Sequence, residues 1–295
     1  MLSRWLVVMS LLCAAFTLPV KSSAQQRSPA VKDWPGTDPT RSTADKGKPI
    51  PVHDLSGLWS GLWGSRLGGQ AGGVQLHPNN GKPENEPPYT PYGLQLYKSH
   101  KPLEGKDQVA PAENNDPRTK CEPLGFPHAN HYDLGVRIYQ DKNNVAMLYQ
   151  YNNTWRIIWT DGRSLPKLAD GGVVVNGDEY REQRYFGYSV GKWIDDYTLE
   201  VHTIGTMPED HVWLDNTGRP ISDQTQVTET LKRVDYDTLE WSETIVDPKI
   251  YTKPWNTMKL DLALQDPRVD VLTRYCSPIE YQKYNSMFGD SASEK

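Results

Sequence analysis

Histidines and carboxylates gather in VHTIGTMPEDHVWLD, residues 201–215, where a strand pattern gives way to a loop. Histidine titrates near neutral pH, so a histidine beside carboxylates can serve as a general acid or base. We therefore predict catalytic roles for His202, His211 and Asp210, and a substrate-binding role for Trp213. A polar loop that caps a sheet is the alternative interpretation of these residues.

The strand that leads into this loop has two chemically different faces. Leu199, Val201 and Thr203 share one face, and Glu200 and His202 lie on the other, because side chains alternate along a strand. A face exposed to solvent is usually more charged than the mixed face that carries His202. We therefore expect His202 and the substrate-binding Glu200 to point into a barrel, with the following loop over its mouth.

A second pair of histidines lies in PHANHYD, residues 127–133. Two histidines three residues apart in a loop can bind zinc when another element adds ligands, and they can also act as acid and base. We predict that His128 and His131 take part in acid–base catalysis without a cofactor. Zinc binding and an ordinary polar loop are the alternatives.

The stretch WTDGRSLP, residues 159–166, admits a structural and a functional interpretation. Asp-Gly is a favoured pair in hairpin turns, and Arg163 could simply pair with an acidic neighbour. In the functional interpretation, Arg163 and Asp161 lie at the mouth of a barrel beside Trp159 and bind a carboxylate or hydroxyl groups of the substrate. The structural interpretation is the favoured one.

From residue 136 onward the chain has a pattern typical of strands joined by Asx- and Gly-rich turns. The predicted strands are VRIYQ (136–140), VAMLYQY (145–151), TWRIIWT (154–160), YFGYSVGKW (185–193), YTLEVHTIG (197–205), QTQVTETLKRV (224–234), TLEWSETIV (238–246) and WNTMKLDLAL (255–264). Helical patterns are confined to residues 91–98 and 277–286. We predict an all-β fold, an antiparallel meander that closes into a barrel and so hides its edges, preceded by long N-terminal loops.

The first predicted strand lies in DLSGLWSG, residues 54–61. Its Gly57-x-Trp59 resembles the Gly-x-Trp motif on the first strand of lipocalin-like barrels, in which the tryptophan closes one end of the barrel. This resemblance implies a lipocalin-like (calycin-type) barrel. Such barrels commonly enclose a ligand cavity.

Longer stretches resemble a broad group of uncharacterised secreted bacterial β-rich proteins. The resemblance rests on DPRTKCEPLGFP (116–127), WTDGR (159–163), SVGKWIDDYTLEVHTIG (189–205), WLDNTGRPISD (213–223), ETLKRVDYDTLEWSETIVDPKIYTKPW (229–255) and RYCSPIEYQKYN (274–285). The chain has His202 where the group usually has Asp, and Ile221 where it often has His. The resemblance implies export and a β-rich architecture.

The N-terminus has the pattern of a secretory signal peptide, with a short basic start, an apolar run and a cleavage site after Ala24. We therefore expect a signal peptide over residues 1–24, a flexible segment over 25–53 and one barrel domain over 54–295, in a periplasmic or secreted protein. Cleavage would leave Cys121 and Cys276, and an even pair in an oxidising compartment predicts a disulfide.

Charge and hydropathy narrow the classes of partner. The formal net charge is −5 and no basic stripe is present, which argues against a nucleic-acid partner. No later apolar run reaches the length of a membrane-spanning helix. We therefore expect a small-molecule partner.

Two classes of function fit these features. The first is an exported, cofactor-independent enzyme (a lyase, isomerase or hydrolase) that uses His, Asp and Glu on a small organic substrate such as an aromatic metabolite or a sugar. The second is a lipocalin-like carrier that binds a small ligand without catalysis. The histidines and carboxylates at predicted strand ends favour the enzyme, because a passive hydrophobic carrier needs neither.

Overall fold

Four long strands form continuous antiparallel ladders in the second half of the chain. They are β7 (Tyr188–Asp195), β8 (Thr198–Ile204), β9 (Gln226–Asp235) and β10 (Thr238–Val246). Aspartates at two of the turns accept backbone hydrogen bonds, from Tyr197 N to Asp195 at 2.8 Å and from Asp237 N to Asp235 at 3.1 Å. Such Asx turns explain why the chain reverses at these positions.

The computed structural model describes residues 47–61, 86–132, 135–166, 173–175, 178–180, 184–208, 210–257, 259–267 and 275–288. The predicted signal peptide (1–24), most of the predicted flexible segment (25–53) and Glu209 lie outside the described residues.

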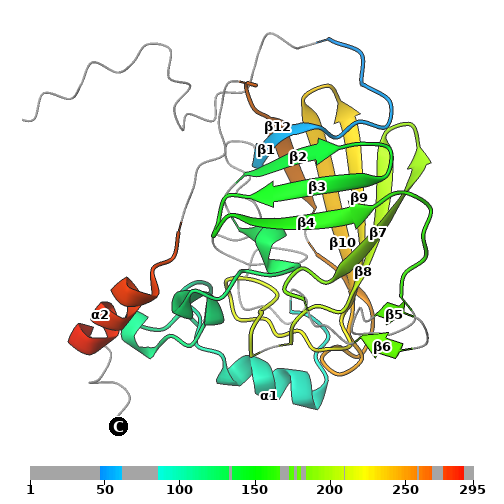
Figure 1. Cartoon of the computed structure of the whole chain (residues 1–295). Helices are drawn as coiled ribbons and strands as arrows, with labels where there is room; N and C mark the ends of the chain where they lie inside the picture. Colours follow the sequence, from blue (N-terminus) through cyan, green and yellow to red (C-terminus); the bar gives the residue numbers. More distant parts are fainter. Residues whose placement is uncertain are drawn as a thin grey trace, which may run out of the picture. The chain divides into compact units, whose positions relative to one another are not determined.

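Five more strands complete a ring with the four long ones. They are β1 (Gly57–Gly61), β2 (Val136–Gln140), β3 (Asn144–Tyr149), β4 (Thr154–Trp159) and β12 (Leu260–Leu264). Within the described residues the order is β9-β10-β12-β1-β2-β3-β4-β7-β8, and β8 pairs again with β9 (Figure 1). The prediction of an all-β barrel is confirmed.

The barrel departs from a pure meander at one junction. β4 and β7 pair in parallel, with Ile158 opposite Ser189, whereas the other barrel pairs are antiparallel. β12 also inserts between β10 and β1. The barrel is therefore mixed, because the chain between β4 and β7 crosses over instead of turning directly back.

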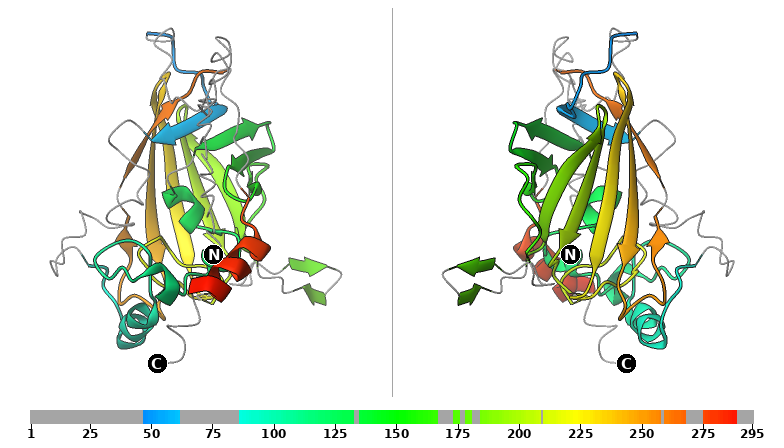
Figure 2. Two further views of the ribbon diagram at one scale, coloured as in Figure 1. Left: turned by 90° about the vertical axis from the view of Figure 1, so that its left-hand side faces the viewer. Right: turned by 90° about the vertical axis from the view of Figure 1, so that its right-hand side faces the viewer.

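The remaining elements are short. They are α1 (Pro91–Ser99), the 3₁₀ turns η3 (Pro111–Glu113), η4 (Pro117–Lys120) and η5 (His128–His131), the hairpin strands β5 (Val173–Val175) and β6 (Asp178–Tyr180), β11 (Trp255–Asn256) and α2 (Pro278–Phe288). Figure 2 shows α1 beyond the end of the long strands and η5 among them. No helix within the described ranges is long and apolar enough to cross a bilayer.

Apolar side chains pack around Trp59 inside the barrel. This tryptophan is completely buried, and its Nε1 donates a hydrogen bond to the Leu55 carbonyl at 2.8 Å. The guanidinium of Arg233 lies 5.2 Å from the centroid of the Trp59 ring and donates to the Asp54 carbonyl at 2.8 Å. Arg233 therefore ties β9 to the segment that enters β1.

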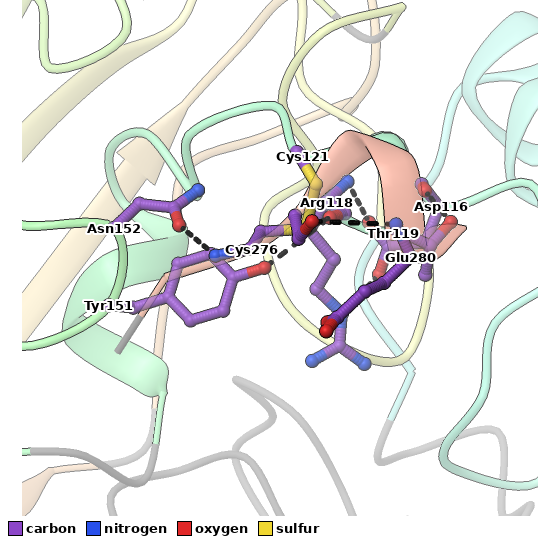
Figure 3. Close-up of a disulfide and its surroundings, with 9 residues drawn as sticks. Asp116, Arg118, Thr119, Cys121, Tyr151, Asn152, Cys276 and Glu280 are labelled. Atoms are coloured by element: carbon purple, nitrogen blue, oxygen red, sulfur yellow. Dashed lines mark hydrogen bonds and ion pairs between the residues drawn. A yellow bond between two sulfur atoms is a disulfide. The ribbon is translucent and has the colours of Figure 1, made fainter. Parts of the chain in front are cut away.

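The predicted disulfide is confirmed: Cys121 and Cys276 are joined (Figure 3). Cys121 directly follows η4, and Cys276 precedes α2. Asn152 Oδ1 accepts a hydrogen bond from the Cys276 backbone N–H at 2.8 Å, and Tyr151 donates to the Arg118 carbonyl at 3.3 Å. The bridge thus attaches the C-terminal helix to the loops that precede β2.

Candidate functional site

Two glutamates face each other inside the barrel. The β9–β10 register places Glu229 directly opposite Glu243, and both side chains are at most 2 % exposed. Like charges at directly opposed positions destabilise a sheet unless other groups compensate for them. One amide nitrogen, Nδ2 of Asn130, donates to both carboxylates, at 3.1 Å to Glu229 and 2.7 Å to Glu243.

Arg156, which points inward from β4, supplies the positive charge. Its guanidinium donates to Glu229 through two nitrogens, one of them at 2.9 Å. It also donates to Thr203 at 2.7 Å and to Ser189 at 3.0 Å. The Phe126 ring lies 3.9 Å from the guanidinium carbon. A buried charge needs such a set of partners, so Arg156 is held in a single orientation.

His131 completes the cluster from the η5 turn. Its Nε2 lies 2.6 Å from Glu243 Oε2, and the side chain is 1 % exposed. The other ring nitrogen, Nδ1, is buried and has no hydrogen-bond partner among the described residues. A neutral imidazole that donates its Nε2–H to a carboxylate keeps a lone pair on Nδ1. The arrangement can therefore accept a proton at Nδ1.

Local hydrogen bonds hold η5 in place inside the barrel. The Ala129 N–H donates to the Gly125 carbonyl at 2.8 Å, and the Asn130 N–H donates to the Pro127 carbonyl at 2.9 Å. Tyr149 on β3 donates its hydroxyl to Asn130 Oδ1 at 2.8 Å. Because Oδ1 accepts from Tyr149, Nδ2 must face the two glutamates, and the amide has one orientation.

Burial dominates the electrostatics of this network. It raises the pKa of the Glu229 carboxyl above its ordinary value, although Arg156 acts in the opposite direction. Burial also raises the pKa of the Tyr149 hydroxyl. Groups with strongly perturbed protonation that meet in one place are typical of functional sites, and also of structural ion-pair networks. We call Arg156, Glu229, Asn130, Glu243, His131 and Tyr149 the interior network.

His128 lies outside this network although it is only three residues from His131. Its Nε2 is 2.6 Å from Asn216 Oδ1, and Asn216 in turn donates to Glu104 at 3.3 Å. Burial lowers the pKa of the His128 imidazole below its ordinary value. The predicted pair of catalytic histidines is therefore split between two environments.

The predicted orientation of β8 is wrong. Leu199, Val201 and Thr203 point inward, whereas His202 and Glu200 are on the outside of the barrel, with 48 % and 38 % of their side chains exposed. His202 lies 3.1 Å from Glu200. The face with the apolar residues is buried because its transfer from water is the more favourable one. The structure does not bring His202 to the interior network.

The loop after β8 forms a separate, half-exposed group. His211 Nε2 lies 3.6 Å from Asp210, its Nδ1 lies 3.7 Å from Glu122, and the Tyr185 ring stands edge-on to it. Trp213 is buried and stacks on His100, outside the interior network. The two predicted histidine clusters therefore do not converge on one mouth.

The turn after β4 carries the other predicted binding residues. Arg163 pairs with Asp161 at 2.6 Å, its guanidinium carbon lies 3.7 Å from the Trp159 ring centroid, and it donates to the Tyr188 hydroxyl at 3.1 Å. The contacts with Asp161 and Trp159 lie within the turn, and the contact with Tyr188 reaches β7. The Arg163–Asp161 pair matches one part of the structural interpretation, but the turn does not close a hairpin, because β4 pairs with β7 in parallel. A role in substrate binding stays a prediction.

Most residues of the interior network were not among the candidates from the sequence. A signal for them exists in the strand pattern, because Glu229 is in phase with Leu231, and Glu243 with Trp241, on the buried faces of β9 and β10. In the same way Arg156 is in phase with the buried Ile158 on β4. A charged residue at an inward position needs a buried partner, which makes it a candidate for function.

Neither a metal site nor a known relative assigns a function to these residues. Within the described part of the chain, no group of three or more His, Cys, Asp or Glu side chains could hold a metal ion. In comparisons with known proteins, no family model, curated protein or solved structure matches this chain. Any proposed function therefore rests on the geometry of the interior network.

Proposed function

We propose that the protein is a cofactor-independent enzyme in which His131, held by Glu243, transfers protons to and from a small organic substrate. One observation carries this proposal: one nitrogen of the buried imidazole is bonded to a carboxylate at 2.6 Å, and the other has no partner among the described residues. A buried polar atom without a partner is costly in a native protein and calls for an explanation such as a ligand.

The network would assist proton transfer in two ways. When Nδ1 takes a proton, the imidazolium ion faces the Glu243 carboxylate, which stabilises the new positive charge. Asn130 donates to the other oxygen of Glu243 and keeps that carboxylate aimed at Nε2. The base is therefore pre-organised before a substrate arrives.

The same contacts favour a lyase or isomerase over a hydrolase with a serine nucleophile. The Ser189 and Thr203 hydroxyls contact each other at 2.9 Å and accept from Arg156. Among the described residues, no hydroxyl hydrogen-bonds His131. A nucleophilic mechanism needs a hydroxyl within hydrogen-bond reach of the base, so direct proton abstraction from the substrate fits better.

We extend the proposal to the type of barrel and to the compartment. The pattern Gly57-x-Trp59 and the Arg233 guanidinium beside the buried Trp59 ring support a lipocalin-like closure of that end. The signal-peptide pattern and the Cys121–Cys276 bridge support export to an oxidising compartment. N-terminal sequencing of the native protein tests the second point: a chain that begins with Gln25 supports it, and a retained Met1 contradicts it.

The test of catalysis is a turnover screen with single variants. The screen would use small aromatic and hydroxylated compounds and follow proton exchange by deuterium incorporation. His131→Gln should lower kcat by about 10²–10⁴-fold, the usual contribution of a positioned acid–base group. His128→Gln is the matched control, because His128 lies in the same turn and is equally buried but contacts Asn216.

The outcomes separate the two classes of function. Loss of turnover in His131→Gln, with the control unaffected and both variants folded, supports the enzyme. Ligand binding without any turnover would support the carrier instead. Equal turnover in wild type and His131→Gln would overturn the proposed role of His131.

A further inference from the structure

One polar atom of the interior network has no hydrogen-bond partner among the described residues, and this limits which ligands the network can recognise. Asn130, Tyr149, Arg156 and both glutamates use their polar atoms on one another or on neighbouring hydroxyls. Nδ1 of His131 is the buried atom of the network that lacks a partner within the described residues. A ligand would therefore find a single polar anchor there.

The chemistry of that anchor follows from the tautomer. Nε2 faces the Glu243 carboxylate, which has no proton to donate when ionised, so the ring proton of neutral His131 lies on Nε2. Nδ1 then offers a lone pair. It accepts a hydrogen bond from an O–H or N–H group and cannot donate one to a carbonyl.

Formal charge disfavours an anion at this position. The single guanidinium of the interior network is already bonded to Glu229, and a second carboxylate, that of Glu243, faces His131. In a buried environment of low dielectric constant, a second anion close by is strongly repelled. The ligand should therefore be uncharged at the group that meets His131.

Three aromatic rings contact the network. Phe126 lies against Arg156, Phe186 stacks on Tyr149 at 5.3 Å, and Trp241 donates its Nε1–H to Glu229 at 3.2 Å. A sugar would bring several hydroxyls to a place with one free acceptor, and each unpaired hydroxyl would lose its hydration without compensation. An aromatic ring has no such cost and prefers offset or edge-on ring contacts.

We propose that the site takes a neutral phenol or aromatic alcohol whose hydroxyl donates to His131 Nδ1. The inference rests on the proposed function, since it names the substrate class of the same histidine. It separates two ligand classes that composition leaves open, aromatic metabolites and sugars. It also assigns Glu243 a positioning role. Its carboxylate oxygen can only accept a hydrogen bond from Nε2, and this sets the tautomer of His131.

The experiment uses the mature chain with its disulfide intact and four probes: phenol, benzyl alcohol, benzoate and glucose. Long-range ¹H–¹⁵N NMR spectra report the tautomer of each histidine, and comparison with His131→Gln identifies the signals of His131. Phenol or benzyl alcohol should shift the Nδ1 signal of His131. Benzoate and glucose should bind at least about tenfold more weakly, and His131→Gln should weaken phenol binding by about ten- to a hundredfold, as expected for loss of a buried hydrogen bond.

A second variant tests the tautomer and distinguishes recognition from simple misfolding. In Glu243→Gln, Asn130 still donates to Oε1, so the new amide turns its NH₂ group toward His131 Nε2. Nε2 must then accept, and the ring proton moves to Nδ1. The variant should lose affinity for phenol and gain affinity for acetophenone, whose carbonyl can only accept. A general loss of structure would weaken both ligands together.

Each outcome has a defined meaning. If neither phenol nor benzyl alcohol perturbs His131, or if benzoate or glucose binds as tightly as phenol, the substrate class is overturned. A shift of the His131 Nδ1 signal that is equal in wild type and His128→Gln, together with weakened phenol binding in His131→Gln, supports it. Phenol binding without turnover of any compound would refute the proposed catalysis but keep the ligand class. Turnover of an anion or sugar that depends on His131 would keep the proposed catalysis but refute the ligand class.

Discussion

Arg156 and Glu229 lie 73 residues apart in the sequence, and they meet inside the barrel through two hydrogen bonds between the guanidinium and the carboxylate. Both side chains are at most 2 % exposed. Glu243, directly opposite Glu229, adds a second buried carboxylate, which Asn130 joins to Glu229. The interior of the barrel thus contains an ionic network. A carrier of apolar ligands would need only apolar side chains at these positions.

Removal of the arginine alone should strongly destabilise the fold. Arg156→Met leaves two opposed carboxylates without their guanidinium, and loss of one partner of a buried ion pair costs about 3–5 kcal/mol. Urea denaturation of wild type and variant measures the difference in free energy of unfolding. The double variant Arg156→Met/Glu229→Leu should recover much of the loss. A single variant within about 1 kcal/mol of wild type would show that the pair is not buried as described.

The disulfide should contribute a large part of the stability. Cys121 and Cys276 are 155 residues apart, and closure of a loop of that length is worth about 5 kcal/mol from chain entropy. Cys121→Ser/Cys276→Ser should therefore unfold at a markedly lower urea concentration than the oxidised protein. Wild type in excess reductant is the control. It should unfold like the variant, and a difference between them would point to an effect of the serines themselves.

Stability should fall in mildly acidic solution because of His128. Burial lowers the folded-state pKa of this imidazole below its usual 6.5, so between that lowered pKa and 6.5 the unfolded chain binds a proton that the folded chain does not. The contribution is complete above pH 6.5 and is lost as the pH falls, by up to about 1.4 kcal/mol per pH unit. Urea titrations between pH 7.5 and 5.5 measure it.

The control for this pH dependence is His128→Gln. The variant lacks the titrating ring, so its stability should fall less steeply over the same range. Burial also lowers the pKa of His100. Its effect on the pH dependence of the free energy of unfolding is the same in both proteins, so it cancels in the difference. Parallel pH profiles would contradict the assignment to His128.

Alanine at His202 should leave activity and stability nearly unchanged. The side chain is 48 % exposed, and its ring nitrogens hydrogen-bond Thr228 and Glu200 on the outside of the barrel. Changes at exposed positions usually stay within about 0.5 kcal/mol, which here corresponds to a melting-temperature shift of at most about 2 °C. A large loss of turnover in His202→Ala, measured beside His131→Gln, would restore the sequence-based prediction for the β8 histidine.

Local sequence patterns predicted most barrel strands, although β5 and β6 were missed and the strand predicted over 255–264 is divided into β11 and β12. The predicted strands over 136–140 and 238–246 coincide with β2 and β10, and the predicted helix over 91–98 falls within α1. Alternation of side chains and Asx turns are properties of neighbouring residues, so they are visible without tertiary structure. The cysteine pairing was also accessible, because the expected signal-peptide cleavage leaves two of the three cysteines, which allow a single intramolecular disulfide.

The residues of the site could not be predicted without the tertiary structure. Alternation along β8 groups His202 with Glu200, but it does not say which of the two faces is buried. That choice depends on the register of the whole barrel, which places Leu199 and Val201 opposite Leu231 and Glu229 on β9. A shift of one residue would exchange the two faces, so the phase can be decided only when all strands pack together.

The sequence by itself determined an all-β chain, most of its strands and its disulfide. Only the tertiary structure decided that β4 pairs in parallel with β7, which brings Arg156 beside Ser189, and that the η5 turn enters the barrel. His131 reaches Glu243 across 112 residues, a contact between side chains on elements with no local relation. Such contacts form because closure of the barrel buries these charges together, and a buried charge is stable only beside its partner.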